Sequence, residues 1–316
     1  MASIVARARA LATPTSTVAA TFARPSWTRS TAPRILRHAR TYATAKQPKT
    51  LPEFSLEGKV CLVTGAARGL GNEFCRAFVN SGCTSLVVVD LKQSEADAAA
   101  EELVNAACVN SDLKPSDFNV IGLECDVSSE LSVQKAFQAT LDKFGRVDSV
   151  VASAGIVENY AAFDYPFDRI KRLFDINVHG AFFTAREAAR IMIPRGGGSV
   201  VLVASMSASI VNIPQPQTPY NAAKAAVRHM ASSLAVEWAK KAVRVNTLSP
   251  GYMLTKLTRT ILTHDPELKR TWESLTPMGR MGEPEDLAGA VVFLASDASR
   301  FMTGTEIRVD GGYCII

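Results

Sequence analysis

A tyrosine and a lysine four residues apart, Tyr220 and Lys224, form the pair whose chemistry is easiest to specify. On a helix this spacing puts both side chains on one face. A tyrosine ordinarily has a pKa of about 10, and a nearby ammonium group favours its phenolate, so the pair can exchange protons near neutral pH. Ser205 directly follows an apolar run typical of a strand. Its hydroxyl would polarise a carbonyl or steady an alkoxide beside the pair.

The Tyr-x3-Lys spacing alone is weak evidence, because Tyr42 and Tyr252 are also followed by a lysine four residues later. Tyr42 precedes the predicted domain, and Tyr252 follows Pro250-Gly251 in a predicted loop. Only Tyr220 combines a helix that has its own start signal with a serine at the end of the preceding strand. Context therefore singles out this one tyrosine as a candidate acid and base.

A glycine-rich turn follows the first predicted strand and opens a helix, with the sequence Thr64-Gly65-Ala66-Ala67-Arg68-Gly69-Leu70-Gly71. Glycine lets the backbone turn tightly and approach a pyrophosphate, while the first N–H groups of the helix bind the anion. Ordinary tight turns also use glycine. The position of this turn between a strand and a helix, in the first βα unit, instead predicts that it binds a dinucleotide cofactor.

The end of the second predicted strand bears on which dinucleotide is bound. Asp90 stands where a carboxylate takes the ribose hydroxyls of the adenosine half, and its charge repels a 2′-phosphate. This favours NAD, although Arg68 and Lys92 supply cations that would accommodate NADP. Asp126 follows the third strand, where it meets the adenine edge or, equally, serves as an acid at a helix N-terminus before a Ser128 cap.

The elements that must position these residues alternate along the chain from about Leu56. Short β-branched apolar runs alternate with longer helical patterns, which predicts a doubly wound Rossmann-type α/β fold, with a parallel sheet of seven strands and helices on both faces. The predicted strands are 60–64, 85–90, 119–124, 148–152, 199–204, 243–248 and 306–309. The predicted helices are 70–80, 94–107, 129–143, 167–193, 219–240 and 284–296. Their start and stop signals are Ser94, Ser128, Thr218 before Pro219, and Gly145.

Two predicted connections are longer than a minimal loop, and such segments tend to carry function. One is a polar surface excursion at 108–118. The other, 252–281, lies beyond the sixth strand and is a candidate lid. No internal repeat or Gly/Ser linker interrupts the pattern, so we expect one domain at 54–316.

The positive charge of the chain is concentrated at its start. Residues 1–42 contain seven arginines and no acidic residue, among Ala, Ser and Thr and without a continuous apolar core. This composition predicts a mitochondrial transit peptide at 1–42 and a linker at 43–53, and Arg40-Thr41-Tyr42-Ala43 resembles a processing site. Plastid import and a disordered basic arm are the alternatives. Without residues 1–42 the net charge falls from +5 to −2, which argues against a nucleic-acid or membrane partner.

Cysteine and histidine spacing gives no sign of metal binding. The six cysteines form no C-x-x-C pair, and the four histidines form no i, i+4 pair. We therefore expect buried, free thiols in a reducing compartment, without disulfides and without a zinc site. No apolar run approaches the roughly 18 residues of a membrane-spanning helix.

As a set, these motifs resemble the short-chain dehydrogenase/reductase family from Leu56 to the C-terminus. The features that fall in the family's order are the glycine turn, Ser205, Tyr220-x3-Lys224, Asn177 in Asp175-Ile-Asn-Val, Pro250-Gly251 and Val309-Asp310-Gly311-Gly312. The resemblance implies a catalytic trio of Ser205, Tyr220 and Lys224, with Asn177 holding a water that relays protons through Lys224. Position and resemblance together predict cofactor contacts from Thr64, Gly65, Arg68, Gly69, Leu70, Gly71, Asp90, Asp126, Ser153, Gly155, Tyr220, Lys224, Gly251, Met253 and Thr255.

Two features depart from the family's pattern. Its usual Asn-Asn-Ala-Gly appears as Ala152-Ser153-Ala154-Gly155, so we expect weaker or water-mediated adenosine contacts there. Ser205 lies 15 residues before Tyr220, two more than is usual, and the usual offset would select Ser207. We prefer Ser205 because it directly ends the apolar strand, and Ser207 is the alternative.

The segments expected above the tyrosine are rich in amides and carboxylates, in Glu158-Asn159-Tyr160 and Asn212-Ile-Pro-Gln215-Pro-Gln217. Buried hydroxyls must be paired, so these groups suit a polyhydroxylated ligand, whereas a steroid or acyl chain calls for an apolar cleft. Solvated loop residues are the alternative interpretation. The predicted substrate contacts are Ser205, Tyr220, Glu158, Asn212 and Gln217.

Three segments, 205–217, 244–255 and 272–274, resemble the fungal polyol branch of the family. Within it they are most similar to ribulose-forming D-arabinitol 2-dehydrogenases, with sorbose reductases, mannitol dehydrogenases and L-xylulose reductases nearby. The resemblance implies reversible hydride transfer between NAD and a polyol, with D-arabinitol and D-ribulose as the expected pair. The predicted transit peptide implies the mitochondrial matrix as the location. The resemblance also implies a homotetramer or homodimer formed through helices 167–193 and 219–240. The alternatives are a mitochondrial 3-oxoacyl-carrier-protein reductase and a catalytically silent, cofactor-binding family member.

Overall fold

The strands follow directly from the apolar runs of the sequence. They are β1 Val60–Thr64, β2 Ser85–Asp90, β3 Asn119–Glu124, β4 Ser149–Ala152, β5 Gly198–Val203, β6 Val243–Pro250 and β7 Glu306–Val309. Within the described residues, 50–109 and 112–315 of this computed structural model, they form one parallel sheet in the order β3-β2-β1-β4-β5-β6-β7. The order reverses between β1 and β4, and open α/β sheets bind ligands at the carboxyl ends of strands at such a point. The predicted doubly wound seven-stranded fold is confirmed.

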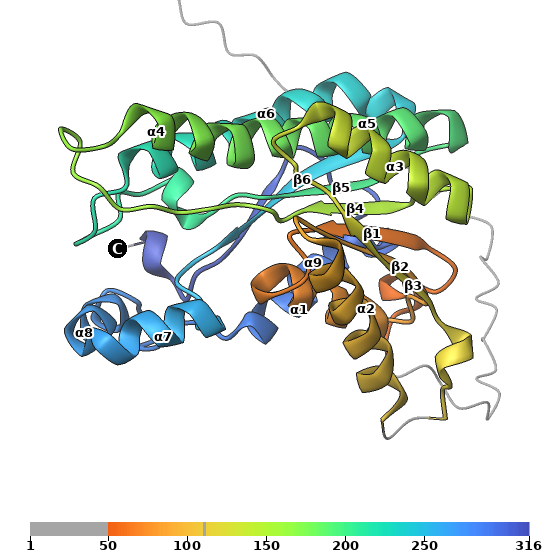
Figure 1. Ribbon diagram of the computed structural model, residues 1–316, viewed down its shortest axis with the longest axis horizontal. Helices are drawn as coiled ribbons and strands as arrows, with labels where there is room; N and C mark the ends of the chain where they lie inside the picture. The colour runs from red at the N-terminus through yellow and green to blue at the C-terminus, as the bar shows by residue number, and fades with distance from the viewer. Residues whose placement is uncertain (1–49, 110–111, 316) are drawn as a thin grey trace, which may run out of the picture. The chain divides into compact units, whose positions relative to one another are not determined.

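Helices cover both faces of this sheet (Figure 1). The helices are α1 Gly69–Asn80, α2 Gln93–Cys108, α3 Glu130–Phe144, α4 Phe167–Phe174, α5 Gly180–Met192, α6 Thr218–Trp238, α7 Lys256–His264, α8 Pro266–Ser274 and α9 Ala288–Ala295. One core lies between the sheet and α3, α5 and α6, and a second lies between the sheet and α1, α2 and α9. Strands buried on both faces explain why their sequences are continuously apolar.

The predicted helix 167–193 is continuous but changes its winding midway. A π-helical turn, Asp175–His179, separates α4 from α5 and contains Asn177. At Gly180 a Cβ would lie only 2.8 Å from a Val127 methyl group, so the helix needs glycine to approach the segment after β3. Wide turns of this kind occur frequently at functional sites.

Helix starts differ from the predicted caps by one or two residues. The N-cap positions are held by Ser129 in α3, Lys92 in α2 and Gln217 in α6, where Ser128, Ser94 and Thr218 were predicted. Ser128 does not cap α3 because its N–H and hydroxyl both bind the Asp126 carboxylate, at 2.9 and 2.6 Å. Gly145 ends α3 with a φ of 70°, as predicted.

The predicted lid, 252–281, contains two helices, α7 and α8, that the sequence pattern did not indicate. Side-chain caps start both, with Thr255 accepting the Thr258 N–H at 3.3 Å and Asp265 accepting the Leu268 N–H at 2.9 Å. Leu262, Trp272 and Met281 form a small core of their own beneath them. Isolated helices this short are marginal, so the caps and this core hold them in place.

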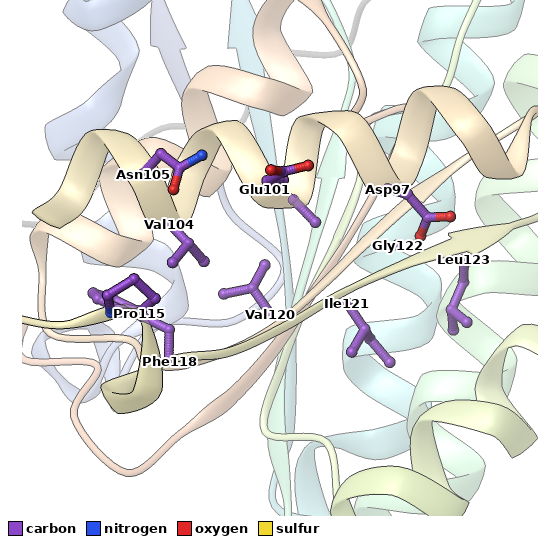
Figure 2. A pocket seen from close by; sticks show the side chains of 11 residues that line it. Asp97, Glu101, Val104, Asn105, Pro115, Phe118, Val120, Ile121, Gly122 and Leu123 are labelled. Carbon is purple, nitrogen blue, oxygen red and sulfur yellow. The ribbon is translucent and has the colours of Figure 1, made fainter.

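β3 is an edge strand of the sheet, and the Gln93 side chain forms hydrogen bonds with part of its open edge. Its amide donates to the Gly122 carbonyl at 2.9 Å and accepts the Glu124 N–H at 2.9 Å. A Cβ on Gly122 would lie 2.5 Å from the Asp97 backbone, so glycine is needed for α2 to pack this closely. Figure 2 shows the groove between α2 and β3, lined by Asp97, Glu101, Val104, Asn105, Pro115, Phe118, Val120, Ile121 and Leu123.

Several predictions concern features that are absent or undescribed. The predicted transit peptide 1–42, with Tyr42, lies outside the described residues, as does most of the predicted linker 43–53. All six cysteines are free, and four of them are buried. In the described part of the chain, no helix is long and apolar enough to cross a bilayer. The same residues hold no cluster of His, Cys, Asp and Glu side chains placed to bind a metal ion.

Candidate active site

Tyr220 and Lys224 lie one helical turn apart near the start of α6, beside the end of β5. The Lys224 ammonium group is buried and donates a hydrogen bond to the Val203 carbonyl at 2.9 Å. Its Nζ lies 5.6 Å from the centroid of the Tyr220 ring. The end of β5 therefore anchors the lysine, and the lysine lies beside the tyrosine ring.

Burial sets the protonation of both groups. It lowers the pKa of Lys224 from 10.5 to about 8. Burial also raises the pKa of Tyr220, and its interaction with Ser205 opposes that rise. The lowering of the Tyr220 pKa by the Lys224 ammonium stays a prediction.

Ser205, rather than Ser207, is the serine that opposes the rise that burial causes in the pKa of Tyr220. Ser205 follows β5 in extended conformation, and its Oγ accepts the Ser207 N–H at 3.2 Å and donates to Ser207 Oγ at 3.0 Å. Ser207 is buried in the 3-10 turn Met206–Ala208 and is approached from behind by Gln217 Nε2 at 3.5 Å. The geometry favours Ser205 as the group that meets the reacting oxygen, and its catalytic role stays a prediction.

Asn177 joins this group through the π-helical turn. Its Nδ2 donates to the carbonyls of Ile156 and Leu173 at 2.9 and 3.0 Å, while its Oδ1 is buried without a partner among the described residues. A Cβ on Gly155 would lie 2.6 Å from that oxygen and 3.5 Å from Lys224 Nζ. The structure therefore brings a free acceptor, the lysine and a glycine together, as the predicted water relay requires.

The glycine turn has the shape that a pyrophosphate needs. Gly65 has a φ of 65°, and a Cβ there would lie 2.7 Å from Ala154 Cα. A Cβ on Gly71 would lie 2.2 Å from the Gly65 carbonyl oxygen. Gly69, in contrast, has a φ of 63° and open space around it at the first turn of α1, where N–H groups lack helical partners. This cradle fits an anionic dinucleotide at the N-terminus of a twelve-residue helix.

Thr64 supports the turn from below. Its buried hydroxyl accepts the N–H groups of Ser153 and Ala154 at 3.2 and 3.3 Å, so it ties the end of β1 to the segment after β4. Leu70 packs partly buried against the core beneath α1. The geometry gives Thr64 and Leu70 supporting positions, with the open backbone at Gly69 nearest to the expected phosphates.

Asp90 ends β2 beside the glycine turn. Its carboxylate accepts the N–H groups of Ala67 and Leu91, each at 2.8 Å. The two cations expected to favour a 2′-phosphate are both engaged by Glu95, Lys92 at 2.6 Å and Arg68 at 3.8 Å. The expected adenosine site therefore presents the Asp90 carboxylate, while the nearby cations Arg68 and Lys92 are paired with Glu95.

Asp126 and the nicotinamide-side residues lie at the carboxyl ends of their strands. Asp126 is exposed, and its bonds to Ser128 match the helix-start alternative, with Ser129 as the actual cap. The Gly251 N–H donates to the Val309 carbonyl at 2.9 Å, and Met253 is buried beside Gly282. Thr255 caps α7, as described above.

The predicted substrate residues are less open than the sequence suggested. The Glu158 carboxylate forms an ion pair with Arg169 of α4, which includes a bond from Nε at 3.2 Å. Gln217 donates to Asn221 Oδ1 at 3.1 Å. Asn212 is buried and donates to the Tyr252 hydroxyl at 3.0 Å. Glu158 is thus not a free carboxylate, and the amides are held by protein partners.

Known proteins share this architecture along most of the chain. A family model described as enoyl-(acyl carrier protein) reductase matches residues 65–314. The chain is 39% identical over 270 residues to the ribulose-forming D-arabinitol 2-dehydrogenase of Candida tropicalis, covering 83% of this chain and 95% of that protein. It is 40% identical over 286 residues to a probable NADP-dependent mannitol dehydrogenase of Yarrowia lipolytica, covering 87% and 98%. The crystal structure of a short-chain type dehydrogenase/reductase from Mycobacterium marinum is 37% identical, with a TM-score of 0.75, covering 83% and 97%.

The chain belongs to the short-chain dehydrogenase/reductase family. Membership makes it an oxidoreductase that uses NAD or NADP. The predicted serine, Ser205, lies 15 residues before Tyr220. In the segment between β5 and α6, Asn212 and Gln217 are both buried.

Sequence reasoning named Gln215 and Trp272 only as parts of longer segments and gave Tyr252 no role, so it did not foresee that these three side chains contact one another. The Tyr252 hydroxyl accepts bonds from both Asn212 and Gln215, and its ring stacks on Trp272. The sequence contained one signal, since Tyr252 directly follows the Pro250-Gly251 motif. It was set aside as a chance Tyr-x3-Lys match.

Proposed function

We propose that this protein is an NAD-dependent polyol dehydrogenase that interconverts D-arabinitol and D-ribulose in the mitochondrial matrix. The observation that carries the proposal is the arrangement of Ser205, Tyr220 and Lys224 at the end of β5, in a chain 39% identical to a D-arabinitol 2-dehydrogenase. The Yarrowia lipolytica relative is described as a probable mannitol dehydrogenase, and mannitol is also a sugar alcohol, which supports the same substrate class.

In this proposal the chain's own residues manage the proton and the oxygen of the substrate. When bound, the nicotinamide supplies the acceptor for the hydride. Tyr220 takes the proton of the reacting hydroxyl, and Ser205, at the end of β5, holds the substrate oxygen. The Lys224 ammonium and the free Asn177 oxygen lie beside Gly155, where they can pass the proton onward through water.

The preference for NAD is supported by the charges around Asp90. A 2′-phosphate would meet this carboxylate, and Glu95 already pairs with the two nearby cations. Recruiting Arg68 or Lys92 for NADP would break those pairs. The mannitol enzyme is described as NADP-dependent, so the two cofactors must be compared directly.

Location and assembly complete the proposal. The arginine-rich, acid-free composition of residues 1–42 supports import into mitochondria and cleavage near Ala43. A homotetramer or homodimer is proposed through α4, α5 and α6. Sequencing the N-terminus of the protein isolated from mitochondria, and measuring its mass in solution, test these two points. An N-terminus at Met1 in another compartment, or a monomer, would refute them.

The activity is tested by following NADH and NADPH absorbance with the purified protein. D-Arabinitol, mannitol, sorbitol and xylitol are the alcohols, and the matching ketoses are used in reverse. We expect the highest kcat/KM with D-arabinitol and NAD. A preference for NADPH would overturn the cofactor proposal, turnover of a 3-oxoacyl substrate but no ketose would favour the acyl-reductase alternative, and tight NADH binding without turnover would favour a silent family member.

A further inference from the structure

A chain of side-chain contacts joins the lid to the segment between β5 and α6, with Tyr252 at its centre. The Tyr252 ring stacks on Trp272 of α8, with 4.0 Å between centroids and 9° between the ring planes. Its hydroxyl accepts hydrogen bonds from Asn212 Nδ2 at 3.0 Å and Gln215 Nε2 at 2.8 Å. Trp272 Nε1 in turn donates to Gln215 Oε1 at 3.3 Å. Four side chains, two from each segment, therefore form one connected unit.

Among the described residues, the donors and acceptors in this unit leave the Asn212 oxygen and the hydrogen of the Tyr252 hydroxyl unused. The indole N–H can only donate, so Gln215 presents its oxygen to Trp272 and its NH2 group to Tyr252. Asn212 also commits its NH2 group to Tyr252. Asn212 is 5% exposed, and its Oδ1 is buried without a hydrogen-bond partner among the described residues. Buried acceptors are nearly always paired, so this oxygen calls for a donor from outside the described chain.

The unused oxygen belongs to the neighbourhood of the reacting group. Ser205 follows β5 and Tyr252 follows β6, and these two strands are neighbours in the sheet, so both residues lie at the same edge. Tyr252 thus contacts Asn212 directly and lies at the sheet edge that also carries Ser205, and its phenol adds to the rise that burial causes in the pKa of Tyr220. A ligand bound at Tyr220 lies within the same cluster of polar groups as Asn212.

We propose that Tyr252 is a positioning residue that aims Asn212 Oδ1 at a substrate hydroxyl next to the one that reacts. The inference rests on the proposed polyol activity. A polyol carries a hydroxyl on the neighbouring carbon, and a simple secondary alcohol does not, so this acceptor selects polyhydroxylated substrates. Because Trp272 fixes Gln215 and stacks on Tyr252, the acceptor is held in place only while α8 is packed against the site.

Tyr252→Phe tests this most directly, since phenylalanine keeps the ring that stacks on Trp272 and removes only the hydroxyl. With the full-length protein and NAD, we expect kcat/KM for D-arabinitol to fall about 30-fold, mainly through KM. The value for 2-pentanol should change by less than about two-fold, with NADH binding unaltered. Asn212→Leu should reproduce the loss, and combining the two should add little, because both remove the same interaction.

Asn105→Leu, at an exposed position on α2, is the matched control for Asn212→Leu. It should leave both substrates unaffected. An unchanged ratio of D-arabinitol to 2-pentanol activity in Tyr252→Phe and Asn212→Leu would overturn the inference. An equal loss on both substrates would also overturn it, since Tyr252 would then support the whole site. Wild-type protein that oxidises 2-pentanol but no polyol would refute the proposed function itself, and the inference with it.

Discussion

The buried ammonium group of Lys224 predicts that the stability of this protein rises with pH in the alkaline range. Lys224 is 5% exposed, and burial lowers its pKa from 10.5 to about 8. Between these two values the unfolded chain holds a proton at Lys224 that the folded chain has released. The free energy of unfolding therefore increases as the pH rises through this window, and the cost of burying the charge is fully present below about pH 8.

The magnitude follows from the difference between the two pKa values. It corresponds to a cost of about 3 kcal/mol at pH 7, which shrinks to about 1 kcal/mol at pH 9.5. A Lys224→Met variant has no charge to bury and so lacks this cost at every pH. It also loses the bond to the Val203 carbonyl, and that loss of about 1–3 kcal/mol does not vary with pH. Wild type should therefore gain about 2 kcal/mol relative to the variant between pH 7 and pH 9.5.

Urea denaturation without cofactor, followed by tryptophan fluorescence, measures this difference. Both proteins are compared at one concentration, because assembly would make apparent stability depend on concentration. Lys240→Met, at an exposed position, is the control and should track the wild type at every pH. The contradicting result is a stability difference between wild type and Lys224→Met that changes by less than about 0.5 kcal/mol between pH 7 and pH 9.5. That result would show that the lysine is not titrating as its burial requires.

Four further predictions follow from the site. Tyr220→Phe should lower kcat by about 10³-fold with unaltered NADH affinity by fluorescence titration, and retained turnover would remove Tyr220 as the base. Ser205→Ala should lower kcat by about 10²-fold and Ser207→Ala by less than about ten-fold, and the reverse order would make Ser207 the reacting serine. Asp90→Ala should raise the kcat/KM ratio of NADPH to NADH at least about ten-fold, and an unchanged ratio would contradict its assigned role. Gly71→Ala, whose Cβ would lie 2.2 Å from the Gly65 oxygen, should lower the melting temperature and abolish NADH binding; a variant with both unchanged would count against the close packing of the turn.

The fold was predictable because its strongest signals are local. Strands buried on both faces require continuous β-branched runs, and β1 and β2 begin and end at the predicted residues. Helix starts were less predictable, because competing bonds decide them: Asp126 takes both polar groups of Ser128 and leaves the cap to Ser129. The helices α7 and α8 escaped notice because each is short and depends on contacts made only in the folded chain.

The residues of the candidate site were predictable where they belong to sequence motifs. They were unpredictable where side chains far apart in the sequence come into contact. Tyr220 and Lys224 could be found from spacing and context, but no sequence pattern indicates that the Lys224 ammonium binds the Val203 carbonyl. Trp272 and Gln215 are 57 residues apart, and only the folded chain brings the indole to the amide. Their contact had no counterpart in any periodicity or composition.

The amide of Gln93 has a consequence for how molecules of this protein meet one another. A bare sheet edge can recruit a strand from a neighbouring molecule, which leads to edge-to-edge aggregation. On β3 the glutamine makes one donated and one accepted bond, the same two that a peptide group of an incoming strand would offer. A second molecule could add a strand here only by breaking both bonds. The Gln93 side chain thus satisfies two backbone groups of this edge strand and opposes the addition of a further strand there.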